Sequence, residues 1–188
     1  MVGTLVYNLI LFLHIVGALG IAAAYTVDAA GLIGLRRSTV SEEARAWLMT
    51  RRWVLLLGPA SIGLVLVSGI YLTIVAWEGA PWIPVALASL VAIAVIGGVL
   101  TGIPMARVEA GFKQAAPGPL SEEVLRGLRT PALTTSITLR IAVTVGIVFL
   151  MVLKPDLLTS LCVIGLATAI GIGSGMAFGA RERIGATP

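Results

Sequence analysis

The amino-acid sequence predicts an all-helical integral membrane protein with five transmembrane helices. Hydrophobic residues make up 58% of the 188-residue chain and charged residues only 12%, whereas a soluble domain carries about 25% charged residues. Five apolar stretches each reach the roughly 20 residues that a helix needs to cross a bilayer. Charged and turn-forming residues separate these stretches. We therefore expect a single transmembrane domain whose principal partner is the lipid bilayer.

The first predicted span is longer than a bilayer requires, so we expect it to tilt, kink or project beyond the lipid. No basic residue precedes it, and although Ala22–Ala24 resembles a signal-peptidase site, we interpret this stretch as a retained span. The five spans are predicted over residues 5–35, 53–77, 83–105, 132–153 and 157–178, with cytoplasmic loops over residues 36–52 and 106–131.

Basic residues predict the orientation of the chain. They gather in the two long loops and in the C-terminal tail, which carries Arg181 and Arg183, whereas Lys154 alone lies in a connection on the other side. By the positive-inside rule, the N-terminus is expected outside and the C-terminus in the cytoplasm of a multi-pass cell-membrane protein. The same distribution accounts for the net charge of +4, so nucleic acid is not an expected partner. Trp77 and Trp82 are expected at the outer interface.

The two long loops contain similar segments. Residues 41–48 and 121–128 each read as a short helix, with Ser41 or Ser121 as the N-cap and acidic residues in the first turn. This predicts a tandem repeat of two-helix units forming a four-helix bundle core, with the fifth helix added to it. The alternative is that any amphipathic loop helix would show this pattern.

Small residues recur every four positions within the spans. Gly165, Ala169 and Gly173 show this spacing in the fifth span, as do Gly171, Gly175 and Gly179. Such faces allow close helix packing, either inside the bundle or against a second copy or another membrane subunit.

A charged pair is predicted inside the membrane. Arg140 stands eight residues into the fourth span, where an unpaired charge is costly. Asp28 lies at a similar predicted depth in the first span, so we expect an Asp28–Arg140 ion pair. It would serve as a buried bridge that fixes packing, as a proton or anion relay, or as a clamp on a cofactor carboxylate.

His14 and Met151 are candidate cofactor-binding residues. Helical rise places His14 about 21 Å outside Asp28 and Met151 about 16 Å outside Arg140, so the two reach nearly the same depth. Imidazole and thioether groups suit haem iron or copper. The alternatives are proton transfer by His14, or a neutral His14 bonded to a carbonyl, Ser68 or Tyr71, with Met151 filling the core.

Two short motifs carry a family resemblance. Residues 13–18, Leu-His-Ile-Val-Gly-Ala, and residues 67–72, Val-Ser-Gly-Ile-Tyr-Leu, followed by Trp77, resemble membrane proteins related to the copper-resistance protein D transmembrane domain. The likeness covers about the first 110 residues. It implies haem or copper binding, with His14 as the matching ligand, and the further histidines of such relatives are not in this sequence.

The sequence contains no phosphate-binding loop, nucleophile triad or HExxH motif, and its single cysteine, Cys162, excludes an intrachain disulfide. An enzyme is therefore not expected. The favoured function is a membrane protein that binds haem b or copper near His14. The alternatives are a small-solute or ion transporter or channel using Asp28 and Arg140, and a structural subunit of a membrane complex.

Overall fold

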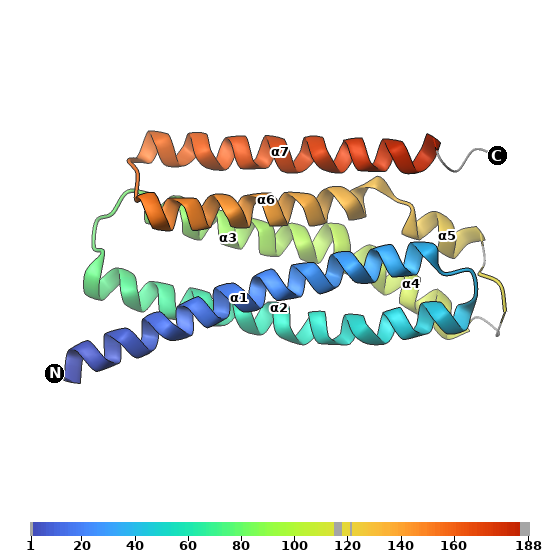
Figure 1. Ribbon diagram of the computed structural model, residues 1–188, viewed down its shortest axis with the longest axis horizontal. Helices are drawn as coiled ribbons and strands as arrows, with labels where there is room; N and C mark the ends of the chain where they lie inside the picture. The colour runs from blue at the N-terminus through green and yellow to red at the C-terminus, as the bar shows by residue number, and fades with distance from the viewer. Residues whose placement is uncertain (1, 115–117, 121, 185–188) are drawn as a thin grey trace.

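The computed structural model describes the backbone of residues 2–114, 118–120 and 122–184, and shows an elongated bundle of helices (Figure 1). The described part of the chain begins and finishes at opposite ends of the bundle (Figure 1). The elements are, in order, α1 (Val2–Arg37), α2 (Ser41–Ala76), α3 (Trp82–Ile96), the π-helix η1 (Gly97–Gly102), α4 (Ile103–Gln114), α5 (Glu122–Leu128), α6 (Pro131–Leu153) and α7 (Leu157–Ile184).

Within the described residues, five helical segments are long and apolar enough to cross a membrane, which confirms the predicted fold class. Four are α1, α2, α7 and the continuous segment formed by α3, η1 and α4; the fifth joins α5 and α6. Large apolar side chains cover their outward faces. Since such surfaces are stable only in lipid, the helices indicate a multi-pass membrane protein.

Helix α2 extends well beyond the predicted second span. Residues 41–52, which were expected in a loop, form its first turns, and α4 likewise continues to Gln114. No glycine or proline interrupts the chain between Ser41 and Arg52, and Glu42 and Glu43 favour a helix start there. At about 1.5 Å per residue, α1 and α2 are each roughly 54 Å long and exceed the thickness of a bilayer.

The expected N-cap at Ser41 is wrong. Val40 occupies the cap position and no side chain caps the helix. Instead, the Ser41 hydroxyl donates to Glu42 Oε2 and accepts the N–H of Gly118, while the Ser41 N–H donates to the Gly118 carbonyl. The start of α2 therefore contacts the segment that follows α4. Ser121 of the proposed repeat lies outside the described residues, and the tandem repeat remains a prediction.

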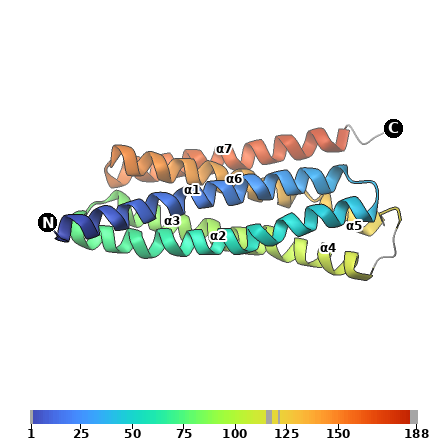
Figure 2. The ribbon, with the colours of Figure 1, turned by 60° about the horizontal axis from the view of Figure 1, so that its bottom comes forward.

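Four helical segments supply the core, and α7 is added to it, as predicted. One buried cluster joins α1, α2, α3 and α6, and a second joins α1, α2, α4, α5 and α6 at the other end of the bundle. Helix α7 lies along α6 in both views (Figures 1 and 2) and contributes only the half-buried Val163 and Ile164 to the first cluster.

Glycines on α7 face two ways. A Cβ atom on Gly171 would lie 2.6 Å from Leu139 Cα, and one on Gly175 would lie 2.5 Å from Thr135 Cα, so both allow close contact with α6. By contrast, a Cβ on Gly165 or Gly173 would meet no atom within 4 Å. The Gly171 face therefore serves internal packing, while the Gly165 face points outward.

Candidate functional site

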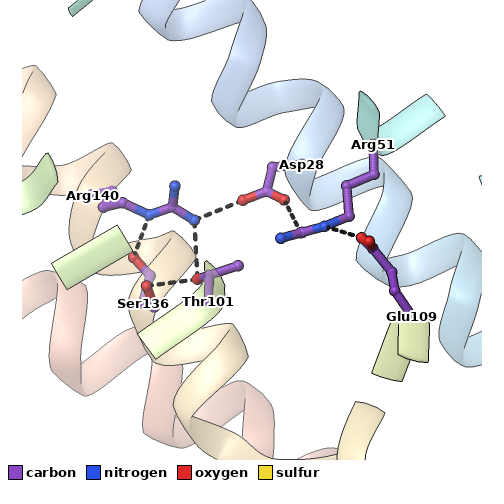
Figure 3. A network of polar contacts seen from close by, with 6 residues as sticks. All are labelled: Asp28, Arg51, Thr101, Glu109, Ser136 and Arg140. Atoms are coloured by element: carbon purple, nitrogen blue, oxygen red, sulfur yellow. Dashed lines mark hydrogen bonds and ion pairs between the residues drawn. The ribbon is translucent and has the colours of Figure 1, made fainter. Parts of the chain in front are cut away.

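The structure brings Asp28 and Arg140 together. Arg140 Nη2 on α6 lies 2.7 Å from Asp28 Oδ2 on α1, and both side chains are buried (Figure 3). The pair fixes these two helices at one relative height, because neither charge can leave its partner without a large desolvation cost.

Two residues that the sequence did not single out complete this group. Arg51 on α2 lies 3.3 Å from Asp28 Oδ1 through Nη1, and 2.9 Å from Glu109 Oε1 on α4 through Nε (Figure 3). Arg51 is buried, whereas the Glu109 side chain is 33% exposed. The chain Arg140–Asp28–Arg51–Glu109, here called the inner network, carries two positive and two negative charges and links four helical segments.

Arg140 is held from several sides. Its Nε donates to the Ser136 carbonyl and its Nη2 also donates to the Thr101 hydroxyl, which in turn donates to Ser136 Oγ (Figure 3). The Arg140 guanidinium carbon lies 4.8 Å from the centre of the Tyr25 ring, a cation–π contact. Gly97 leaves room for it, because a Cβ there would lie 3.1 Å from Arg140 Cδ.

Thr101 and Gly97 both belong to the π-helix η1. A π-helix carries extra backbone within one turn and frequently occurs at functional sites. Here it places the Thr101 hydroxyl and the gap at Gly97 against the same guanidinium. A cavity of about 10 Å³, roughly the volume for one water molecule, adjoins Asp28, Arg51 and Thr101.

His14 lies on the same helix as Asp28, nearer the N-terminal end of α1. Its Nδ1 is 3.0 Å from Ser68 Oγ on α2. The single hydroxyl hydrogen of Ser68 is donated to the Leu64 carbonyl, so the network assigns the imidazole hydrogen to Nδ1 and leaves Nε2 with a free lone pair. Gly69 makes room for the ring, since a Cβ there would lie 3.2 Å from His14 Cε1.

His14 and Met151 both line one cavity. The cavity has a volume of about 550 Å³ and lies between α1, α2, α3 and α6. We call it the outer cavity, after the expected orientation. Its lining is mostly apolar, with a few polar groups from His14, Tyr7, Thr73 and Lys154. The other residues that line it are Leu11, Val65, Gly69, Ile70, Leu72, Ile74, Trp77, Trp82, Ile83, Ala86, Leu87, Leu90, Ile147 and Met151.

An apolar layer separates the outer cavity from the inner network. Ala18 and Ile21 lie between His14 and Tyr25 on α1, and Val143 and Ile147 lie between Arg140 and Met151 on α6. These side chains belong to the buried cluster around Val65 and Ile93. The two polar regions are therefore separate sites within one bundle.

The donor atoms at the outer cavity suit haem better than copper. Among the residues that the structure describes, no three His, Cys, Asp or Glu side chains gather as a metal would require. A copper ion would have only His14 and Met151 as side-chain donors here. A porphyrin supplies four nitrogens itself, so its iron needs only one or two ligands from the protein. The free Nε2 of His14 and the volume of the cavity fit this requirement.

Comparison with protein-family models, with curated protein sequences and with solved structures finds no match. The likeness to the copper-resistance protein D domain therefore depends on the two short motifs alone.

Proposed function

We propose that this membrane protein binds haem b in the outer cavity, where His14 would supply a ligand to the iron. The observation that carries the proposal is the orientation of His14: Ser68 holds Nδ1, and the ring borders a 550 Å³ apolar cavity. A hydrogen bond at Nδ1 is the usual means of presenting Nε2 to a metal. Most cofactor sites are apolar cavities of about 300–1,000 Å³ with few polar groups.

Met151 is the candidate for a second ligand, because among the described residues it is the only sulfur-containing side chain that lines the cavity. A His–Met pair raises the reduction potential of haem relative to a His-only site. Bound haem would supply one-electron redox chemistry or ligand binding at the iron. The chain's own contribution would be to orient the imidazole through Ser68 and to exclude water with its apolar lining.

The test is titration of the detergent-purified protein with haem, followed by absorption spectroscopy in both oxidation states. We expect a Soret band that shifts on binding, and a loss of affinity of at least tenfold for His14→Ala. Met151→Leu should change the spectrum of the low-spin ferric state, whereas Met176→Leu, an exposed methionine on α7, should leave it unchanged. Haem binding with the same affinity and spectrum in His14→Ala would refute the proposal. A metal assay on the purified protein separates haem from copper.

Transport of a proton or small ion is the second candidate, and the inner network favours it. Asp28 and Arg51 adjoin a water-sized cavity, and the network reaches a partly exposed carboxylate at Glu109. If this network carries ions, Asp28→Asn and Arg140→Gln should each reduce the flux into liposomes containing the protein. Equal fluxes for these variants and the natural chain would contradict transport.

A further inference from the structure

Lys154 occupies an unusual position at the mouth of the outer cavity. It caps the C-terminal end of α6 with a left-handed backbone, φ 52° and ψ 51°, and its N–H donates to the Leu150 carbonyl. It is the one non-glycine residue with a positive φ in the described part of the chain. Such a conformation is unfavourable for a residue with a side chain, and Pro155 follows it directly.

An aromatic pair positions the Lys154 ammonium. Its Nζ lies 3.8 Å from the centre of the Trp77 ring, and Trp77 meets Trp82 edge to face with ring centres 6.5 Å apart. All three side chains line the outer cavity. The exposed Lys154 side chain thus lays its ammonium over the Trp77 ring, at the border of an otherwise apolar space.

Among the described side chains, no carboxylate is paired with this charge. Glu78 and Asp156 are near Lys154 in the fold, yet neither forms an ion pair with it among the side chains that the structure describes. The positive-inside rule also disfavours a basic residue at this end of the bundle. A cation at this position, beside an apolar cavity, is suited to bind a ligand that has an apolar body and an anionic group at its edge.

We propose that Lys154 binds a propionate carboxylate of a porphyrin whose ring occupies the outer cavity. This inference rests on the proposed function, because it takes the ligand to be haem. Lys154 lies three residues after Met151, less than one helical turn further toward the end of α6. A porphyrin in this cavity would therefore have the Lys154 ammonium at its border, within the same set of lining residues as His14 and Met151.

The experiment uses metal-free protoporphyrin IX and its dimethyl ester, which share the same ring but differ in charge. Neither contains iron, so neither depends on His14 as a ligand. Binding to the full-length protein in detergent is followed by quenching of tryptophan fluorescence at pH 7.5. We expect Lys154→Gln to weaken binding of the diacid about fivefold, the upper range for an exposed ion pair, and to leave binding of the diester unchanged. Lys154→Arg should retain most of the affinity for the diacid.

Glu78→Gln is the matched control, since Glu78 lies at the same end of the bundle but does not line the cavity. It should not weaken binding of the diacid. Thermal unfolding of each variant without ligand shows whether the fold is intact. Equal weakening of diacid and diester by Lys154→Gln would mean a structural role for Lys154 and would overturn the inference, as would no weakening of either.

The two proposals fail in different ways. If the diacid binds through Lys154 but the spectrum of bound haem is the same in the natural chain and in His14→Ala, then ligation of the iron by His14 is refuted and the carboxylate site stands. If haem binding requires His14 but the diacid binds independently of Lys154, only the carboxylate site is refuted. If neither haem nor protoporphyrin IX binds to the natural chain, both proposals are wrong.

Discussion

At the scale of single residues, Asp28 is held by two partners at once. Its two carboxylate oxygens face two different arginines, Arg140 and Arg51. One carboxylate cannot balance two guanidinium groups, and Glu109 supplies the second negative charge through Arg51. Burial of each charge is costly, and the mutual pairing offsets that cost only while every partner is present.

Replacing Asp28 with asparagine should therefore destabilise the protein. Two buried guanidinium groups would face a single carboxylate, and removing one partner of a buried pair costs about 3–5 kcal/mol. We expect a lower midpoint of thermal unfolding in detergent. Glu78→Gln, which removes an exposed carboxylate with no partner in the described structure, should leave the midpoint unchanged. Equal midpoints for Asp28→Asn and the natural chain would show that the network contributes little stability.

At the scale of elements, the contact between α6 and α7 depends on glycines, which have no side chain to hold the two helices apart. Gly171 and Gly175 allow the α7 backbone to approach Leu139 and Thr135 on α6. The closeness of the helices also permits an interhelical hydrogen bond, in which the Thr138 hydroxyl donates to the Gly171 carbonyl at 2.7 Å. Close approach of this kind is what drives helix association in lipid, where apolar burial alone gives no advantage.

The start of α7 has its own polar contact. The Thr159 N–H donates to the Asp156 carboxylate at 2.7 Å, and this hydrogen bond lowers the pKa of Asp156. The carboxylate accordingly stays ionised at neutral pH, where it satisfies one of the free N–H groups of the first turn.

Two glycine substitutions on α7 should have opposite effects. In Gly171→Ala, the new methyl group would meet the Leu139 backbone, which cannot yield like a flexible side chain. We expect destabilisation of about 1–3 kcal/mol, as for other overpacked sites. Gly165→Ala introduces the same methyl group into open space and should be neutral or slightly stabilising, because alanine favours helix. Chemical unfolding in mixed micelles compares the two, and equal stabilities would contradict the close contact.

At the scale of the whole molecule, charge is distributed unevenly between the two ends. The end that includes the C-terminus of α1 carries most of the arginines, whereas the end that includes the α2–α3 and α6–α7 connections carries Glu78, Lys154 and Asp156. The five candidate spans of the described residues are an odd number, in agreement with the start of α1 and the last turns of α7 at opposite ends of the bundle in Figure 1. The positive-inside rule then predicts an external N-terminus.

Cysteine labelling tests this orientation. In a Cys162→Ser background, which removes the natural thiol, Glu78→Cys should react with a membrane-impermeant maleimide in intact cells. Arg37→Cys should react only after the membrane is permeabilised. The reverse pattern would mean that the cytoplasmic and external ends have been exchanged, and would place the outer cavity on the cytoplasmic side.

The sequence predicts the spans well because uninterrupted apolar stretches leave few alternatives to helices in lipid. It also points to Asp28 and Arg140 together, since a charge in an apolar span requires a partner. Arg51 was missed because it lies among four other arginines between the first two spans, where basic residues ordinarily mark a loop. The signal that could have found it is the absence of a helix breaker from Ser41 onward, which continues α2 past Arg51.

The cavity and the role of Lys154 could not be predicted, because both depend on how helix ends meet. Nothing in the local sequence shows that α6 ends in a left-handed residue that places its ammonium on Trp77. The contact joins residues on two separate connections of the bundle. From the sequence alone, the position of Lys154 between two apolar stretches indicates only on which side of the membrane it lies.

The spacing of the inner network along the chain has a consequence for synthesis. Asp28 is separated from Arg51 by 23 residues and from Arg140 by 112. As the chain leaves the ribosome, α1 and α2 are complete long before α6 exists, so Arg51 is the first counter-charge that Asp28 can meet. Glu109 follows with α4, and Arg140 arrives last. Arg51, Glu109 and Arg140 thus each emerge after a contact partner of opposite sign, so the contacts of the inner network become possible in the order of translation.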